Sequence, residues 1–496
     1  MANSPIVNAD TVLDTRRSFI GGESVSSTSG ETFDTRYPGT NRVICAVEQA
    51  GQREVDLAVE SATAGFAEWS AMPAVERSRI LRRAVDIIRG RNDELAALDT
   101  LDAGRPIGET TTEDVPTGAD VIEFYAGLVP AIHGETVDFP GGFARMRREP
   151  LGVCVGIGAW NYPIQIAMWK SGLALACGNA MIFKPAEVTP ISAGFLAEIY
   201  LEAGVPAGVF NVVQGDARVG QMLVRHPGVA KVSLTGEAGT GKIVMADAAG
   251  SLKHVTLELG GKSPIVVFDD ADVDSARNAA ITNNFYSTGQ VCSHGTRVFV
   301  QRGVYDEFLA GLAERVAGWQ VGDPFDPDTL IGPLVSAEHH DKVMSYMRAA
   351  IDSGARHVVG GVVPDDPALA NGNYVTPAVF ADCTDDMAFV TDEVFGPLMS
   401  VLPFDDETEV LARANGTDYG LAGAVFTRDI SRANRVANAI QAGFVWINDY
   451  GTMPASIPFG GYKHSGIGRE NGEQAIEHYT QIKTVYTNLE PVERYL

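Results

Sequence analysis

The sequence contains little cysteine, and its cysteines are not spaced for disulfides or for metal binding. There are five in 496 residues, at Cys45, Cys154, Cys177, Cys292 and Cys383. Their number is odd, and no Cys-x-x-Cys or Cys/His zinc pattern occurs. We therefore expect reduced thiols in a reducing compartment.

Long apolar runs are also missing. No stretch offers the roughly 20 apolar residues that a membrane-spanning helix needs. The first residues, MANSPIVNADTV, have neither the basic start nor the apolar core of a secretory signal peptide. Together these absences predict a cytoplasmic protein.

Positive charge is scarce. The chain has 38 Lys and Arg against 63 Asp and Glu, which gives a formal net charge of −25. Such a charge disfavours nucleic acid and anionic membranes, so we expect neither as a partner. It is compatible with attraction of a cationic substrate, although many proteins are acidic for solubility alone.

The Gly-x-Gly-x-x-Gly fingerprint of dinucleotide sites is absent as well. Residues 234–242 instead read LTGEAGTGK, which has the form of a strand end, a glycine turn and a helix start. Such a turn offers backbone N–H groups and a helix N-terminus to a diphosphate. A P-loop is excluded because the glycine spacing before Lys242 does not fit, and Ile243 stands where Ser or Thr would bind the metal.

What is present is an alternation of strand and helix patterns. With 45% hydrophobic residues, a chain of this length is expected to form two large domains. Short apolar runs at 153–159, 180–183, 209–213, 232–234 and 254–259 alternate with helical patterns at 164–176, 190–203, 217–224 and 241–249. This order predicts a Rossmann-like, doubly wound parallel sheet. From about Ser263 a second α/β block follows, with helices expected at 272–287 and 305–319.

Residues 285–297, FYSTGQVCSHGTR, contain the candidate nucleophile Cys292. The pattern predicts a helix that ends at Gly289, a tight loop that carries the cysteine, and then a strand. The glycine would let backbone pass close to a ligand and leave N–H groups for a developing negative charge. Most single cysteines serve packing, so a base and an oxyanion donor are needed to support catalysis.

Two polar residues supply those functions. Glu258 falls on the polar side of the alternating strand 255–259, just before Gly260 and Gly261, where a partly desolvated carboxylate could act as a general base. Asn161, in GIGAWNYP, can donate an amide N–H to an oxyanion. Taken singly, Glu258 could be an ordinary ion-pairing residue and Asn161 a turn asparagine before a proline.

The motifs GAWNYP, KPAE, LELGGKSP, GQVCSHGTR, DEVFGPL and PFGGYKHSGIGREN, in this order, resemble the NAD(P)-dependent aldehyde dehydrogenase superfamily. GADVIEFYAGL and GYKHSGIGRENG are similar to its betaine aldehyde and trimethylaminobutyraldehyde branch. The resemblance implies a cofactor domain (1–132 and 152–262), a catalytic domain (263–476) and a small β arm (133–151 and 477–496). In the family this arm is shared between subunits, which implies a homodimer or homotetramer.

The resemblance also implies a cofactor site. Its residues are Gly158, Ala159, Trp160, Lys184, Pro185, Ala186, Glu187, Gly236, Gly241, Gly260, Glu393 and Phe395. A carboxylate at Glu187 would accept the ribose hydroxyls and repel a 2′-phosphate, which favours NAD while leaving NADP possible. Glu237 replaces a serine that is common in the family, and we expect it to point away from the diphosphate.

For the chemistry, the resemblance implies that Cys292 forms a thiohemiacetal and then a thioester, which water activated by Glu258 hydrolyses. Asn161 and the Cys292 backbone N–H would hold the oxyanion. Lys170 and Glu470 would form a proton-relay pair near the base. Because relatives that transfer the acyl group to CoA lack this base, Glu258 favours hydrolysis.

The expected substrate is betaine aldehyde, whose trimethylammonium group suits aromatic faces. The positions implied are Tyr162, Trp169, Tyr286 and Phe459. A hydrophobic wall for any apolar aldehyde remains an alternative. Phe459 replaces a frequent tryptophan, and His294 replaces a common asparagine.

The branch also binds potassium. The matching positions are Thr35, Arg36, Asp102 and Val188, with a second set at Leu252, Lys463 and Gly466. Arg36 stands where the branch has an apolar residue.

Three functions remain open from the sequence. The first is oxidation of betaine aldehyde to glycine betaine, an osmolyte. The second is oxidation of other amino-aldehydes, such as trimethylaminobutyraldehyde or aminobutyraldehyde. The third is a nucleotide-binding protein that keeps the fold without turnover, against which Cys292, Glu258 and Asn161 argue.

Overall fold

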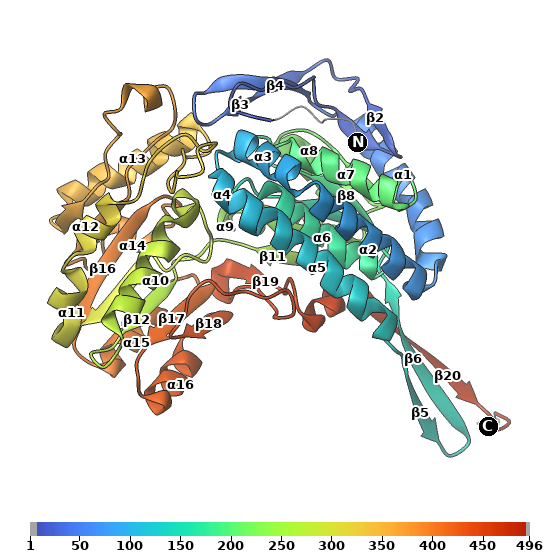
Figure 1. Cartoon of the computed structure of the whole chain (residues 1–496). Coiled ribbons are helices and arrows are strands. Elements are labelled where there is room, and N and C mark those ends of the chain that lie inside the picture. The colour runs from blue at the N-terminus through green and yellow to red at the C-terminus, as the bar shows by residue number, and fades with distance from the viewer. Residues whose placement is uncertain (1–6, 493–496) are drawn as a thin grey trace.

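The computed structural model describes residues 7–492, which form two α/β lobes and a thin projecting arm (Figure 1). Two predictions fall partly outside these residues. One concerns the first residues, where we expect no signal peptide, and the other concerns the end of the arm. Within residues 7–492, no helix combines the length and the apolar composition needed to cross a membrane.

The first lobe is built on an eight-stranded sheet. In spatial order its strands are β19 (Gly466–Ile467), β11 (His254–Glu258), β10 (Lys231–Thr235), β7 (Val153–Ile157), β8 (Ala180–Lys184), β9 (Phe210–Val212), β1 (Ser18–Ile20) and β2 (Glu23–Val25). The five central strands are parallel, and the pairings of β19 and of β1 are antiparallel. Strand β7 and the first four residues of β8 are apolar, and all of them except Ile157 are buried, as expected of a sheet covered on both faces.

Helices cover this sheet on both faces (Figure 1). They are α1 (Gln52–Ala71), α2 (Ala74–Gly90), α3 (Asn92–Ala103), α5 (Val115–Leu128), α6 (Pro163–Ala176), α7 (Ser192–Ala203), α8 (Ala217–Arg225) and α9 (Ala238–Ala249). Between α3 and α5 lie the short α4 (Ile107–Glu109) and a π-helical turn, Thr110–Asp114. The predicted doubly wound parallel sheet is confirmed.

The second lobe contains a seven-stranded sheet. Its spatial order is β14 (Arg356–Val359), β15 (Ala378–Ala381), β16 (Leu398–Phe404), β13 (Arg297–Gln301), β12 (Pro264–Val267), β17 (Ala422–Phe426) and β18 (Phe444–Ile447). The helices are α10 (Val273–Phe285), α11 (Arg302–Leu309), α12 (Leu312–Ala317), α13 (Ala337–Asp352), α14 (Ala388–Thr391), α15 (Glu407–Asn415) and α16 (Ile430–Ala439). Only β14 runs antiparallel to its neighbour.

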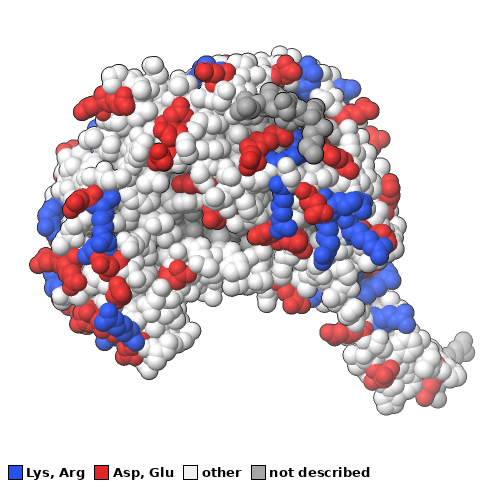
Figure 2. All heavy atoms as spheres, in the orientation of Figure 1, with Lys and Arg blue, Asp and Glu red and all other residues white. Residues whose placement is uncertain are grey.

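The arm is a three-stranded antiparallel sheet. Its strands are β5 (Glu135–Phe139), β6 (Gly142–Pro150) and β20 (Thr480–Asn488), with Thr480 opposite Pro150 and Asn488 opposite Gly142. The two segments that we assign to the arm from the sequence therefore pair with each other. In the view of Figure 2, the outer part of the arm shows a mostly uncharged surface with some acidic side chains, and basic side chains lie near its base. The domain limits that we draw through these segments stay predictions.

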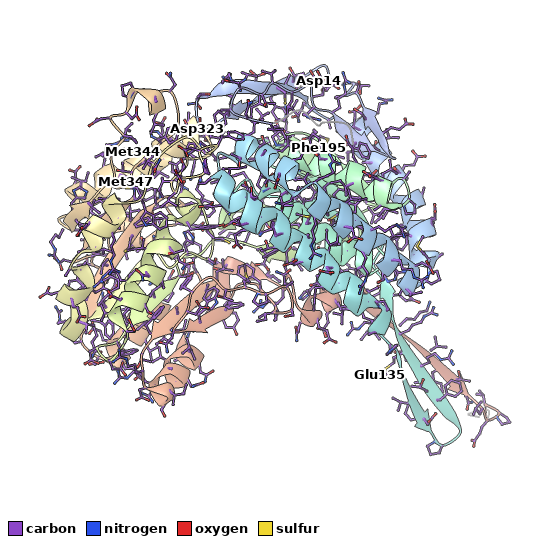
Figure 3. The ribbon with its side chains drawn as sticks, viewed as in Figure 1. Asp14, Glu135, Phe195, Asp323, Met344 and Met347 are labelled. Carbon is purple, nitrogen blue, oxygen red and sulfur yellow. The ribbon has the colours of Figure 1, made fainter. Side chains whose placement is uncertain are left out.

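A second hairpin, β3 (Thr32–Tyr37) with β4 (Arg42–Glu48), lies beside the first lobe (Figure 1). The Tyr37 hydroxyl donates to the Asp323 carboxylate at 2.8 Å, and Asp323 is labelled in Figure 3. This contact links the N-terminal hairpin to the second lobe.

Two helix predictions for the second lobe need correction. The helix before Cys292 ends at Phe285 and not at Gly289, because Asn283 leaves the helical conformation and its amide donates to the carbonyl of Tyr450 at 3.3 Å. The single helix expected over 305–319 is two helices. They are separated at Gly311, whose φ of 72° lies in the left-handed region.

Candidate active site

A cavity of about 410 Å³ opens between the two lobes, with walls from both. Asn161 follows strand β7, Glu258 ends strand β11 and Cys292 follows helix α10. All three residues line this one cavity. The predicted nucleophile, base and oxyanion donor, drawn from distant parts of the chain, are therefore brought together.

The loop that presents Cys292 is tightly built. After α10 the chain makes a 3₁₀ turn, Tyr286–Gly289, in which Ser287 and Thr288 have φ values of 53° and 54°. A Cβ at Gly289 would lie 2.3 Å from the carbonyl of Gly396, so only glycine fits there. Cys292 is partly exposed, whereas the four other cysteines are buried, and all five are free thiols as expected.

Burial raises the pKa of the Cys292 thiol to about 12, and the nearby carboxylates of Glu393 and Glu258 act in the same direction. The thiol is therefore protonated at neutral pH in this arrangement. Its activation requires a group that can accept the proton.

Glu258 has the properties of such a group. Both of its carboxylate oxygens are buried without a hydrogen-bond partner. Burial, followed by the nearby Glu470, raises its pKa well above the usual range. A buried carboxylate that nothing satisfies is costly in a purely structural role and typical of a site for proton transfer.

The side-chain amide of Asn161 is buried beside the nucleophile loop. It donates to the backbone carbonyl of Gln290, two residues before Cys292, at 2.9 Å. A primary amide has two N–H groups, so the second is available to a ligand in the cavity.

Behind Glu258, Lys170 of α6 and Glu470 form a buried ion pair at 2.5 Å. The Ser233 hydroxyl joins them: Lys170 donates to it at 2.9 Å, and it donates to Glu470 at 3.1 Å. The predicted pair is therefore in contact, and Ser233 is a member that the sequence did not indicate.

The cavity continues into a second one of about 480 Å³ along the first sheet. Both are lined by Ala159, Trp160, Ala186, Glu187, Thr235, Gly236 and Glu237. Gly158 and Lys184 line only the second cavity, and Gly260, Glu393 and Phe395 only the first. The combined groove has a size typical of a cofactor site.

Two of the predicted cofactor residues do not line the groove. Pro185 is buried between Lys184 and Ala186. Gly241 lies in the first turn of α9, where a Cβ would approach the Leu259 side chain to 2.7 Å. Gly241 therefore permits close packing of the helix on the sheet.

Lys184 and Glu187 form an ion pair at 3.1 Å, with the Lys184 side chain buried and that of Glu187 about half exposed. Glu237, which we expect to point away, is exposed and lines both cavities. The only hydrogen bond to its carboxylate among the described residues comes from the Thr240 hydroxyl, at 3.4 Å. The carboxylate thus lies at the N-terminus of α9, in the groove itself.

Glu393 packs against the glycines that follow β11. Its carboxylate accepts a hydrogen bond from the Gly261 N–H at 2.9 Å. A Cβ at Gly260 would lie 2.0 Å from the carboxylate, which explains the glycine. Burial raises the pKa of Glu393 to about 7.

Phe395 belongs to an aromatic cluster with Trp160 and His339. The Trp160 ring lies 5.1 Å from Phe395 and 4.9 Å from His339, between ring centroids. A ring nitrogen of His339 lies 2.7 Å from the Phe395 carbonyl. This contact helps to hold Phe395 in its left-handed conformation, with φ of 59°.

The four predicted substrate aromatics form two pairs. Trp169 of α6 contacts Phe459 edge to face at 6.2 Å. Tyr162 and Tyr286 both lie against the guanidinium of Arg105, at 4.0 and 5.5 Å from the ring centroids. A cation of the protein therefore already contacts part of the predicted aromatic site. His294 is buried nearby, and burial together with Arg105 lowers its pKa to about 3.

The potassium sites gain no support from the structure and stay predictions. The two oxygens of Asp102 accept hydrogen bonds from the Thr35 hydroxyl at 3.1 Å and the Ile191 N–H at 2.8 Å. Lys463 donates to the carbonyls of Asn415 and Thr417. Of the other positions, Arg36 and Leu252 are exposed, and Val188 and Gly466 are partly buried. Within residues 7–492, no cluster of three or more His, Cys, Asp and Glu side chains could hold a metal ion.

Several lining residues were not found from the sequence. His339 and Lys342 of α13 line the first cavity, and Arg105 contacts the predicted substrate aromatics. In the sequence, Arg105 is only part of the Gly-Arg-Pro that ends a helix, and the two residues of α13 lie on an ordinary amphipathic pattern. Their partners come from distant segments, so no local signal could have identified them.

Comparison with known proteins gives consistent results. The model of the aldehyde dehydrogenase family matches residues 24–485. A Bacillus cereus aldehyde dehydrogenase in complex with NAD+ is 40% identical, with a TM-score of 0.93 over 96% of this chain and 97% of that one. A Staphylococcus aureus betaine aldehyde dehydrogenase in complex with NAD+ is 39% identical, with a TM-score of 0.94 over 97% and 96%. An indole-3-acetaldehyde dehydrogenase mutant from P. syringae, in complex with NAD+ and IAA, is 37% identical, with a TM-score of 0.93 over 96% and 97%.

Proposed function

Because this chain belongs to the aldehyde dehydrogenase family, we propose that it oxidises an aldehyde to the carboxylic acid with NAD as the hydride acceptor. The observation that supports this most directly is that Cys292, Glu258 and Asn161 line one cavity. A protein that only binds a nucleotide would not need an unpartnered buried carboxylate beside a thiol.

In the proposed mechanism, Glu258 or a water molecule takes the Cys292 proton, and the thiolate attacks the aldehyde carbon. The carbonyl oxygen becomes an oxyanion, which the free N–H of the Asn161 amide and the Cys292 N–H stabilise. NAD, when bound in the groove, supplies the hydride acceptor. Loss of the hydride from the carbon leaves a thioester on Cys292.

Glu258 then removes a proton from water, and the resulting hydroxide attacks the thioester carbon. The carbon–sulfur bond breaks, the acid leaves, and the thiolate of Cys292 is restored. The proton on Glu258 lies near the buried group of Glu470, Lys170 and Ser233, which is a route away from the site. Because burial raises the pKa of Glu258, its carboxylate is a stronger base than that of an exposed glutamate.

The groove residues fit an NAD molecule. Glu187 and Lys184 would hold the adenosine ribose, and Glu393 the nicotinamide ribose, with Phe395 beside the nicotinamide ring. The N-terminus of α9, at Gly236, would face the diphosphate. The carboxylate of Glu237 is an unfavourable neighbour for that diphosphate and must move aside or be neutralised, for instance by Lys342, which lines the same cavity.

For the substrate we propose betaine aldehyde. Support comes from the aromatic residues Tyr162, Trp169, Tyr286 and Phe459, and from the similarity to the Staphylococcus aureus betaine aldehyde dehydrogenase. The Arg105 guanidinium lies over Tyr162, so the Trp169–Phe459 pair is the better surface for a trimethylammonium group. Longer amino-aldehydes such as trimethylaminobutyraldehyde share that group and remain the second candidate.

The test is a specificity comparison with the purified protein. Reduced cofactor is followed by absorbance with betaine aldehyde, trimethylaminobutyraldehyde, aminobutyraldehyde and indole-3-acetaldehyde, each with NAD and with NADP. We expect the highest kcat/KM for betaine aldehyde with NAD and no signal from Cys292→Ala. A higher kcat/KM for a longer amino-aldehyde or for the uncharged indole substrate would overturn the betaine aldehyde proposal. No signal with any aldehyde would overturn the proposal that this protein oxidises aldehydes.

A further inference from the structure

Arg105 is a fully buried cation to which the reaction assigns no role. It follows Gly104, the left-handed residue that ends α3, and its side chain is only 1% exposed. It forms ion pairs with Asp114 at 2.7 Å and with Glu109 at 3.2 Å. Burial of these charges is costly, and the two ion pairs of Arg105 offset part of that cost.

The cluster reaches across to the nucleophile loop. The Arg105 guanidinium donates to the Ser287 hydroxyl, and Glu109 accepts a hydrogen bond from the Ser287 N–H at 3.0 Å. Ser287 and Thr288 have left-handed backbone conformations, which residues other than glycine rarely adopt. The N–H and the hydroxyl of Ser287 are therefore both bound by residues of the first lobe.

The same guanidinium also contacts the oxyanion side of the site. It lies 3.4 Å from the backbone carbonyl of Asn161, whose side-chain amide donates to Gln290 in the nucleophile loop. Its flat face lies on the Tyr162 ring, and it is 3.4 Å from the Tyr286 hydroxyl. One side chain thus contacts the segments that supply the amide, the aromatic wall and the approach to Cys292.

We propose that Arg105, with Glu109 and Asp114, is a positioning residue that fixes the position of the Cys292 loop relative to the Asn161 amide. Its planar fork makes several hydrogen bonds at once in fixed directions, which lysine cannot do. Misplacement of a reacting group by about 1 Å can cost about 10² in rate. The expected effect of Arg105 on turnover rests on the proposed function. Its effect on the Cys292 loop can be tested without turnover, through the reactivity of the thiol.

The experiment compares Arg105→Met with Arg105→Lys in two assays. The first is the rate at which iodoacetamide alkylates Cys292, read by mass spectrometry without cofactor or aldehyde. The second is turnover, with kcat and the KM for NAD determined separately. Arg77→Met is the matched control, since Arg77 also donates to backbone carbonyls, those of Met72 and Ala176, but lies in α2 away from the cavity.

We expect Arg105→Met to change the alkylation rate by about tenfold or more and to lower kcat by about 10², with little change in the KM for NAD. Arg105→Lys should recover part of both, and Arg77→Met should leave both within about twofold of the unaltered protein. If Arg105→Met is folded by circular dichroism and behaves like Arg77→Met in both assays, the proposal is overturned.

If Arg105→Met does not fold, Ser287→Ala carries the test, because it removes only the hydroxyl that the guanidinium contacts. An alkylation rate and kcat unchanged in Ser287→Ala would then overturn the proposal, and a change of about threefold or more in both would support it. Should the unaltered protein oxidise no aldehyde while alkylation still depends on Arg105, the proposed function fails and the positioning role stands.

Discussion

The carboxylate of Glu258 is buried without a hydrogen-bond partner. As the proposed base, Glu258 is needed to release the thioester, whereas water can take the Cys292 proton in its place, so Glu258→Gln should give one burst of reduced cofactor and then stall. We expect steady-state kcat to fall by about 10²–10⁴. Rapid-mixing absorbance resolves the burst. The control is Glu68→Gln, an exposed change on α1, which should turn over normally. Steady turnover without a burst by Glu258→Gln would contradict the assignment.

The pKa of Cys292 leads to a pH prediction. Burial raises it to about 12 in the free enzyme, and the thiolate is the reactive form. Below the pKa, the thiolate fraction grows about tenfold for each pH unit. The rate of alkylation by iodoacetamide, without cofactor, should therefore rise continuously from pH 7 to pH 10. A plateau near neutral pH would show that the thiol is already ionised and that this prediction is wrong.

Glu187 gives a prediction about the cofactor. Its half-exposed carboxylate pairs with Lys184 and would repel a 2′-phosphate. Glu187→Ala removes the repulsion and leaves Lys184 free to attract the phosphate, so the ratio of kcat/KM for NADP to that for NAD should rise by about tenfold or more. Glu202→Ala, an exposed change on α7, is the control. An unchanged ratio would mean that Glu187 does not select the cofactor.

Residues with a local signature could be predicted, and residues defined by distant partners could not. Cys292 has a glycine before it and Glu258 ends an apolar strand, so both could be proposed from their own segments. Arg105 depends on Ser287 and Tyr162, which come from other segments of the chain, and no local pattern joins it to them. Glu237 has a signature but its side-chain direction could not be derived, because that depends on the groove formed by both lobes.

At the scale of elements, the buried pair of Lys170 and Glu470 joins α6 to the C-terminal segment. Glu470→Gln would leave Lys170 buried without its counter-charge. We expect this to lower the free energy of unfolding by about 3–5 kcal/mol.

The double variant Lys170→Met with Glu470→Met should recover much of that loss, because neither charge is then left alone. Urea denaturation followed by fluorescence measures both. The opposite order, with the double variant less stable than Glu470→Gln, would show that the pair itself stabilises the fold.

Helices and strands with a clear hydrophobic periodicity could be predicted from the sequence. The residues at which they end could be predicted less accurately. The parallel strands β7, β8, β10 and β11 follow directly from short apolar runs. Helix α10 stops four residues before its expected end, because Asn283 bonds to the carbonyl of Tyr450, which lies far along the chain. Tertiary contacts of this kind override the local pattern.

At the scale of the whole molecule, the arm exposes apolar side chains that its own sheet cannot cover. Ile482 is 63% exposed, Tyr486 61% and Leu489 70%. Contiguous exposed apolar surface on a thin sheet is typical of an interface. We therefore propose that the arm joins copies of this chain as a homodimer or homotetramer.

Ile482→Asp should weaken this association, because a charge would be buried in an apolar contact. We expect the mass measured by light scattering to fall by half or more, with far-ultraviolet circular dichroism unchanged. Gln481→Asp adds the same charge at the neighbouring, already polar position and should not change the mass. If the unaltered protein is a monomer, the arm has another role.

The strand that ends at Glu258, the proposed base, gains its outer neighbour from a segment far along the chain. Its outer neighbour is β19, where Leu257 pairs with Ile467 and Glu258 with Gly466. A nascent chain on the ribosome thus has to emerge past Ile467 before that edge is sealed and Glu258 loses contact with water. Termination before Gly466 would leave an open sheet edge and an ordinary, hydrated glutamate, so such fragments would be both inactive and prone to aggregate.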